Sequence, residues 1–260
     1  MTYKTQFVCF LWGDIYPESY VERLYNSVKL YFTHDFTFHC FSDKKLNINS
    51  NIIQHEIILG SPFYGNWNKE RVFSSGFLNL PDGVDIVIMD IDILVTGSLN
   101  FLIEEKPNEP LVMAPDGYKS RKGAGHGSVY RVKANSLPHI WNDLINADYD
   151  SLIKIFGSER EQRWLDRYFP ANKVSLFSEG KVVSYKYHCS SKGLAPFGKK
   201  AAFFGLTNAL WSKALLPEDA RVVCFHGKPD LEDVENTNYG RWKHAPFIRN
   251  ALSMLPINNK

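Results

Sequence analysis

Asp90 and Asp92, separated by one isoleucine, directly follow the most apolar run of the sequence, at 84–89. Such a run predicts a strand that is buried on both faces. Ligands of open α/β sheets bind beyond the carboxyl ends of the strands. Because side chains at i and i+2 of a strand end lie on the same side, the two carboxylates can share one hard cation with the oxygens of a diphosphate. Such a cation would neutralise charge on a diphosphate leaving group.

The same spacing occurs a second time, at Asp148 and Asp150. This second pair lies in a polar stretch between two expected helices and has no apolar run before it, so we expect it on the solvated surface. The Asp-x-Asp pattern alone is therefore not specific. Its position after a strand favours Asp90 and Asp92 as the metal ligands.

The run FHGKP at 225–229 ends another apolar stretch and offers the remaining parts of a diphosphate site. A neutral imidazole from His226 can complete a carboxylate metal site, most naturally for Mn²⁺. Gly227 permits a close approach of the backbone to a ligand, and Lys228 offers a point charge to a phosphate. We therefore predict that His226 joins the aspartate pair as the third metal ligand, with Gly227 and Lys228 beside the diphosphate.

A sheet must bring these residues together, and the spacing of apolar residues predicts one. We expect strands at 7–11, 36–41, 52–59, 84–89, 111–114, 128–132 and 221–225. We expect helices at 17–31, 136–156 and 159–168. The polar stretch at 231–238 predicts a loop. Strands and helices joined by short connections are typical of an α/β fold with a mostly parallel sheet.

The composition of the 260 residues is that of a soluble globular protein, and we expect one domain over 1–260. The net charge of +2 gives no reason to expect a nucleic-acid partner. The four cysteines include no Cys-x-x-Cys pair, and three lie in expected strands, which indicates a reduced protein. The sequence contains no evident signal peptide and no run long enough to span a membrane. We expect a cytoplasmic protein whose only membrane contact would be peripheral, at the inner face.

Several segments resemble the nucleotide-sugar glycosyltransferases of the GT-A fold, particularly the glycogenin-like and lipopolysaccharide galactosyltransferase-like enzymes. They are VCFLWG at 8–13, FHCFSD at 38–43, NWNKERVF at 66–73, IVIMDIDILVTG at 86–97 and the FHGKP run. The resemblance implies an α/β fold with a mixed, mostly parallel central sheet flanked by helices. It also implies a nucleotide-binding part at about 1–97, an acceptor-side part at about 98–230 and a C-terminal tail at about 231–260.

The resemblance also implies roles for individual residues. Asp43 would contact the nucleoside of the donor, and Lys69 would reach the donor. Phe10, Trp12 and Ile91 would line the donor site. The expected cofactor is Mn²⁺ or Mg²⁺, the expected donor a UDP-sugar, and the expected acceptor a hydroxyl group, for example on a bacterial surface glycan.

Two positions depart from the pattern of these enzymes. No Asn occurs at 125–128, where they usually carry one, and Arg163 replaces the second acid of their Asp-Gln-Asp stretch. The donor sugar and the stereochemistry therefore stay open. An inverting enzyme needs a base within reach of the acceptor hydroxyl, for which Asp116, His126 and Glu161 are candidates.

Other functions fit the sequence less well. A haloacid dehalogenase-like phosphatase also places Asp-x-Asp after an apolar strand, but it expects Thr or Val where this chain has Leu94. A dinucleotide-dependent oxidoreductase expects a Gly-x-Gly-x-x-Gly run after the first strand, which is absent here. A non-catalytic nucleotide-sugar-binding module stays open, because Arg163 and the missing Asn are compatible with lost turnover.

Overall fold

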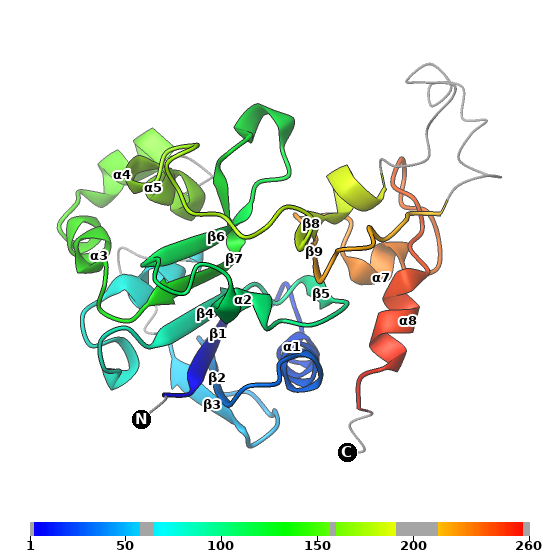
Figure 1. Cartoon of the computed structure of the whole chain (residues 1–260), viewed down its shortest axis with the longest axis horizontal. Coiled ribbons are helices and arrows are strands. Elements are labelled where there is room, and N and C mark those ends of the chain that lie inside the picture. Colours follow the sequence, from blue (N-terminus) through cyan, green and yellow to red (C-terminus); the bar gives the residue numbers. More distant parts are fainter. Residues whose placement is uncertain (1–2, 58–64, 157–159, 191–212, 257–260) are drawn as a thin grey trace.

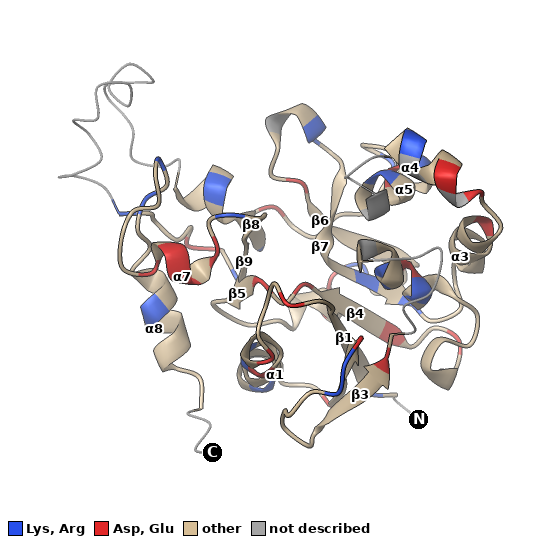
Figure 2. Ribbon diagram, turned by 180° about the vertical axis from the view of Figure 1, so that it is seen from behind, with Lys and Arg blue, Asp and Glu red and all other residues tan. Residues whose placement is uncertain are grey.

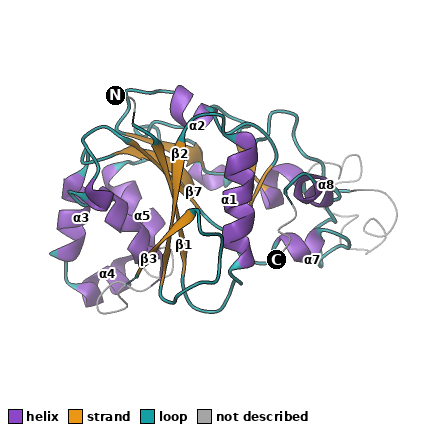
Figure 3. Ribbon diagram, turned by 90° about the horizontal axis from the view of Figure 1, so that it is seen from below, coloured by secondary structure: helices purple, strands orange, loops and turns teal. Residues whose placement is uncertain are grey.

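The computed structural model describes residues 3–57, 65–156, 160–190 and 213–256. In this part of the chain, a large and a small β-sheet lie next to each other, with helices around them (Figure 1). Helices α3, α4 and α5 lie on one face of the large sheet and α1 lies on the other (Figure 3). Both signs of charge are interspersed over the elements, in keeping with the net charge of +2 (Figure 2).

The large sheet has six strands in the order β3-β2-β1-β4-β7-β6. Strands β1, β2, β3 and β4 run parallel, whereas β7 is antiparallel to both β4 and β6. The expected mixed and mostly parallel sheet is therefore confirmed. Its strands are β1 (Thr5–Leu11), β2 (Phe36–Ser42), β3 (Ile52–Glu56), β4 (Asp85–Met89), β6 (Leu111–Pro115) and β7 (Gly125–Lys133).

The small sheet has three strands in the order β5-β9-β8, of which only β9 was expected from the sequence. Strand β9 is antiparallel to β5 and parallel to β8. The strands of this small sheet are β5 (Ile93–Val95), β8 (Val182–Ser184) and β9 (Val222–Cys224).

Helices fill most of the connections between the strands. The α-helices are α1 (Ser19–Tyr31), α2 (Phe101–Glu104), α3 (Pro138–Ile145), α4 (Tyr149–Phe156), α5 (Arg160–Tyr168), α7 (Leu231–Val234) and α8 (Phe247–Ser253). Shorter helical turns are η1 (Gly65–Phe73), η2 (Phe77–Asn79), η3 (Lys119–Arg121) and the π-helical η5 (Tyr185–Cys189). No helix within the described ranges combines the length and the apolar character that a membrane span needs.

Burial of strand β1 on both of its faces explains why its sequence is continuously apolar from Phe7 onward. Phe7 and Cys9 pack in the core on the α1 side, whereas Val8 and Phe10 pack in the core on the side of α3 and α5. A strand covered on both faces has no solvated side on which a polar residue is favoured. The same holds for β4, whose Val87 and Ile88 belong to opposite cores. The four cysteines are buried free thiols, three of them in strands.

Three expectations about secondary structure are wrong. The helix expected at 136–156 is two helices, α3 and α4. Asp148 lies between them, where its carboxylate accepts the Ser151 N–H at 2.9 Å, whereas Asp150 lies in the first turn of α4. Both side chains are exposed as expected. The loop expected at 231–238 begins with α7, because Asp230 and Asp233 form a reciprocal capping box at its first turn. The third strand ends at Glu56 and excludes Ile57, and residues 58 and 59 of the expected strand lie outside the described residues.

Candidate functional site

A cavity of about 620 Å³ lies beyond the carboxyl ends of β1 and β4. Most of the residues that the sequence singled out line it. From the donor-binding prediction these are Phe10, Trp12, Lys69, Asp90, Ile91 and Gly227. From the metal-binding and catalytic predictions they are Asp92, His226, Asp116 and His126. The fold thus brings residues from 10 to 227 of the sequence to one place.

The carboxylate pair directly follows strand β4, as the sequence predicts. It lies in the turn between β4 and β5. The Asp90 N–H still donates to the carbonyl of Ser128 at 2.8 Å, which extends the β4–β7 pairing by one residue. Asp92 comes directly before β5. Both residues line the cavity.

Each carboxylate of the pair has a partner from another part of the chain. The Lys69 ammonium group, from η1, lies 2.5 Å from Oδ1 of Asp90 and 3.3 Å from the carbonyl of Gly127. The hydroxyl of Tyr16 lies 3.2 Å from Oδ2 of Asp92 and 3.3 Å from Oδ1 of Asp230. Burial, with a further contribution from Asp90, raises the pKa of the Asp92 carboxyl to about 7. A positive charge near Asp92 would therefore be strongly favoured.

The third predicted ligand, His226, faces His126 with 4.5 Å between the ring centroids. Burial lowers the pKa of His226 to about 3, and His126 contributes to the shift. The imidazole is thus neutral at pH 7 and has a lone pair to offer. Two carboxylates and a neutral imidazole are a donor set that suits Mn²⁺ or Mg²⁺.

The three side chains are nevertheless not gathered into a ligand set. Within the described ranges no three His, Cys, Asp or Glu side chains are arranged to hold a metal ion. In this structure the Lys69 ammonium group neutralises the Asp90 carboxylate, which a bound cation would otherwise use. The donor set fits a cation in chemistry, and binding one would require Asp90 to exchange or share its partner.

Gly227 and Lys228, both expected beside the diphosphate, differ in position: only Gly227 lines the cavity. Gly227 lines the cavity with a φ of +57°, a left-handed conformation that favours glycine. Lys228 does not line it. Its side chain is 61% exposed and its ammonium group forms ion pairs with Asp230 at 2.8 Å and Asp233 at 3.0 Å. Asp230 and Asp233, which form the capping box of α7, are thus the carboxylates that hold Lys228. No pattern in the sequence indicated this capping box.

Asp43, expected near the nucleoside, is not among the residues that line the cavity. Its Oδ2 accepts the N–H of Gly13 at 2.9 Å, next to Trp12, which lines the cavity. Its Oδ1 is buried and has no hydrogen-bond partner among the described residues. A buried acceptor without a partner is unfavourable, so this oxygen is suited to a donor group of a ligand.

The three candidate bases differ in what the structure says of them. Both oxygens of Asp116 are engaged, one by the Arg121 guanidinium at 2.6 Å and the other by the Tyr118 N–H at 2.8 Å. The Nδ1 atom of His126 accepts the Ser128 N–H at 3.1 Å, so the neutral ring carries its proton on Nε2. Burial lowers the pKa of His126. Glu161 belongs to α5, but its side chain lies outside the described residues.

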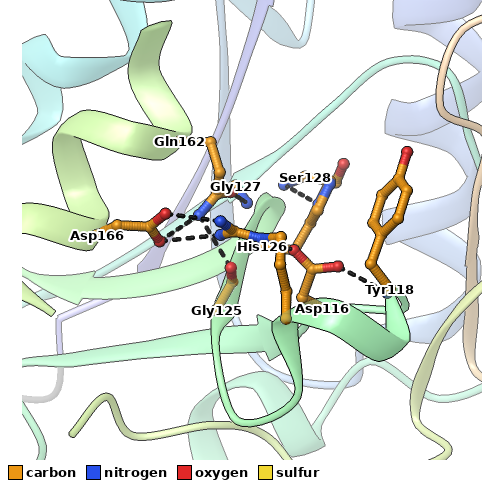
Figure 4. Close-up of polar contacts among 9 residues, drawn as sticks. Asp116, Tyr118, Gly125, His126, Gly127, Ser128, Gln162 and Asp166 are labelled. Atoms are coloured by element: carbon orange, nitrogen blue, oxygen red, sulfur yellow. Dashed lines mark hydrogen bonds and ion pairs between the residues drawn. The ribbon is translucent and has the colours of Figure 1, made fainter. Parts of the chain in front are cut away.

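Four residues near the cavity carry polar contacts that the sequence did not reveal: Tyr16, Arg121, Gln162 and Asp166. Arg121 binds Asp166 through two parallel hydrogen bonds of 2.8 and 3.0 Å. Figure 4 shows Gln162 between Asp166 and the first residues of β7, with His126 nearby. Gln162 directly precedes Arg163 and thus belongs to the stretch compared with Asp-Gln-Asp, whereas no local pattern indicated the other three.

No model of a known protein family matches this chain, and no curated protein matches it. Solved structures do match. The galactosyltransferase LgtC, in complex with donor and acceptor sugar analogues, matches over 98% of this chain and 98% of its own, with 12% identity and a TM-score of 0.56. An active-site mutant of LgtC matches over the same shares with 13% identity and a TM-score of 0.56.

The glycosyltransferase GlyE of Streptococcus pneumoniae TIGR4 matches over 88% of this chain, with 16% identity and a TM-score of 0.52. This chain spans 56% of the length of GlyE. At such low identity the matches define the fold. The chain has the GT-A glycosyltransferase fold, as the sequence resemblance implied.

Proposed function

We propose that this protein is a metal-dependent glycosyltransferase that moves a sugar from a nucleoside-diphosphate sugar to a hydroxyl acceptor. The observation that carries the proposal is the cavity of a GT-A fold lined by Asp90, Asp92 and a neutral His226. Bound Mn²⁺ or Mg²⁺ would supply Lewis-acid stabilisation of the diphosphate leaving group. These three side chains would hold the cation, which also relieves the buried charge of Asp92.

The remaining donor contacts follow from groups at or near the cavity. The orphan Oδ1 of Asp43 suits an N–H or O–H group of the nucleoside, and Trp12 offers a flat apolar wall for a ring. Lys69 is placed to balance charge beside Asp90. Lys228 would bind the diphosphate after leaving its ion pairs with Asp230 and Asp233. We favour a UDP-sugar as the donor.

The acceptor half of the site is less defined by its residues. We propose a hydroxyl acceptor, such as a bacterial surface glycan, because LgtC carries an acceptor sugar analogue in its complex. In this arrangement Nε2 of His126 is a hydrogen-bond donor, and Asp116 is engaged by Arg121. We further propose a cytoplasmic protein that can contact the inner face of the membrane.

The GT-A fold gives the phosphatase interpretation no support. A non-catalytic nucleotide-sugar-binding module is the second candidate, and the Lys69–Asp90 ion pair of 2.5 Å favours it, because an ammonium group occupies one carboxylate oxygen of the pair. The two candidates differ in one outcome. A binding module would hold the donor and release no free sugar or nucleoside diphosphate.

A thermal-shift screen of nucleotide-sugars with and without Mn²⁺ tests the donor half of the proposal. We expect a nucleoside-diphosphate sugar to raise the melting temperature in a Mn²⁺-dependent way, and Asp92→Ala to remove the rise. Absence of any such rise across the panel would refute the proposed function. A rise that survives in Asp92→Ala would refute the metal assignment alone.

A further inference from the structure

Helix α7 carries the acids that hold Lys228, and these contacts are local. Lys228 forms its ion pairs with Asp230 at 2.8 Å and with Asp233 at 3.0 Å. The capping box that joins Asp230 to Asp233 lies within the same short segment. These contacts fasten the Lys228 side chain to α7. They do not determine how α7 is oriented toward the carboxylate pair.

Apolar packing holds α7 to one face of the small sheet. Leu231 and Val234 are fully buried in the same core as Leu94 of β5. Helix α1 packs on the other face, where Val21 shares a core with Ile93, the neighbour of Leu94 in β5. Hydrophobic contacts are non-directional, so two apolar side chains hold a single helical turn without fixing its orientation. Polar contacts are needed to orient it.

Side chains at the start of α1 supply such contacts. Nη1 of Arg23 donates to Oε1 of Glu232 at 2.9 Å, and the Tyr20 hydroxyl donates to the other oxygen of Glu232. The hydroxyl of Tyr16, which precedes α1, lies 3.3 Å from Oδ1 of Asp230. Both oxygens of the Glu232 carboxylate are therefore bound from α1. Hydrogen bonds to an ionised carboxylate are directional and stronger than neutral ones.

The same side chains also contact the turn that carries the carboxylate pair. The Tyr16 hydroxyl lies 3.2 Å from Oδ2 of Asp92, and Nη2 of Arg23 lies 3.5 Å from the carbonyl of Ile91. The Arg23 guanidinium stacks 3.8 Å from the centroid of the Tyr20 ring, which is 4.9 Å from that of Tyr16. This group of side chains thus contacts the carboxylate turn on one side and α7 on the other.

We infer that Arg23 and Glu232 are positioning residues, which orient α7 so that Lys228 lies within reach of a diphosphate at the carboxylate pair. This inference rests on the proposed function, which gives Lys228 its ligand. Arg23 and Glu232 are not among the described residues that line the cavity, so they act on the ligand through α7. Glu232 is 53% exposed, and such an ion pair adds little stability. Its effect is therefore expected mainly in ligand affinity.

Arg23→Met tests the inference, because Met keeps an apolar stem against Tyr20 and removes the guanidinium. Glu232→Gln removes the charge from the exposed partner, and it tests the same pair if the change at Arg23 impairs folding. Arg249→Met is the matched control. Arg249 of α8 forms an ion pair of 3.7 Å with Glu235, at the end of α7. This control removes a cation from α7 and leaves the contacts with α1 in place.

The first measurement needs no ligand. Melting temperatures are determined in EDTA for Arg23→Met, Glu232→Gln and the double variant. We expect each single change to lower the melting temperature by about 1–3 °C, as for an exposed ion pair. The double variant should melt close to the less stable single variant, because both changes remove one interaction. Shifts that simply add would show that the two side chains do not act together, and would overturn the inference.

The second measurement is calorimetric binding of UDP in the presence of Mn²⁺. We expect Arg23→Met and Glu232→Gln each to weaken binding about tenfold, the effect of one hydrogen bond to a charged group, and Arg249→Met to leave it unchanged. The comparison that separates placement of Lys228 from a general structural effect uses Lys228→Ala. In that background Arg23→Met should weaken binding by less than about twofold, because the contact through which it acts is already absent.

The two proposals fail in different ways. Unchanged UDP affinity in both Arg23→Met and Glu232→Gln refutes the positioning role and leaves the proposed function standing. So does a loss of affinity that persists in full in the Lys228→Ala background. A wild-type protein that binds neither UDP nor any nucleotide-sugar in Mn²⁺ refutes the proposed function, and with it the role in placing Lys228. Non-additive melting shifts would in that case still support the docking of α7 on α1.

Discussion

Replacing Asp92 by Asn should stabilise the protein in the absence of divalent cations. Burial and Asp90 raise the pKa of Asp92 from 3.8 to about 7, so the ionised carboxylate is unfavourable in the folded state. One pKa unit corresponds to about 1.36 kcal/mol, which makes the unfavourable contribution at most about 4 kcal/mol above pH 7. Asn keeps the shape and can still accept a hydrogen bond from Tyr16. The variant therefore removes the charge and retains the contact.

The pH dependence has a definite sign. The folded-state pKa of Asp92 lies above the unfolded value, so the folded protein binds the extra proton between about pH 4 and pH 7. The wild-type free energy of unfolding consequently loses this contribution as the pH rises through that window. Asp92→Asn is neutral at every pH and lacks the loss. The difference between the two proteins should be small at pH 4 and largest above pH 7.

The assay is urea unfolding with EDTA present, at pH 4.5 and pH 8, with melting temperatures as a second measure. About 2–4 °C per kcal/mol is expected for a protein of this size, so the gain at pH 8 should be several degrees. Asp150→Asn is the control, because Asp150 is exposed on α4. If Asp92→Asn is less stable than the wild type at pH 8, or if the gain does not depend on pH, Asp92 is not a buried, destabilising charge.

Three further predictions concern the stability contributions of Lys69, Gly125 and His39. Lys69→Met should lower the free energy of unfolding by about 1–3 kcal/mol at pH 7, since it leaves Asp90 without its charged partner, and urea titration beside Lys69→Arg measures this. Gly125→Ala should destabilise by about 1–3 kcal/mol in urea titration, because the new Cβ would lie 2.6 Å from Sδ and 2.9 Å from Cβ of the buried Met113. Burial, with a contribution from a neighbouring histidine, lowers the pKa of His39 to about 4. Its folded-state pKa lies below the usual value of about 6.5, so stability should fall as the pH drops from about 6.5 to 4, and His39→Asn should flatten this part of the pH–stability curve.

The sequence predicted the large sheet because its central strands β1 and β4 are covered on both faces. In β1 and β4 burial leaves no polar alternation, and continuous apolar runs mark such strands plainly. It missed β5 and β8, which have three residues each, too few for a pattern to emerge. Their pairing with β9 joins segments far apart in the chain. It also missed α7, because the charged residues of its capping box resemble a polar loop.

The candidate site was predictable where it depends on strand ends. Asp90 and His226 closely follow β4 and β9, and although these strands belong to different sheets, both residues line the cavity. The position of Lys228 was not predictable, because it depends on the ion pairs with α7. The stretch that contains Gln162 was noted from the sequence, but its hydrogen bonds to Gly125 and Gly127 were not predictable, because they join segments far apart in the chain. The roles of all these residues in binding and catalysis stay predictions.

The most direct test of the central claim is the release of nucleoside diphosphate from a panel of UDP-sugars, with and without hydroxyl acceptors, in Mn²⁺ and in EDTA. We predict release in Mn²⁺ that EDTA abolishes and that Asp92→Asn lowers by at least about 10²-fold, because the variant removes a proposed cation ligand. Release that is equal in wild type and Asp92→Asn would contradict the assignment of the carboxylate pair. No release from any nucleotide-sugar, despite Mn²⁺-dependent binding, would contradict catalysis and favour the binding module.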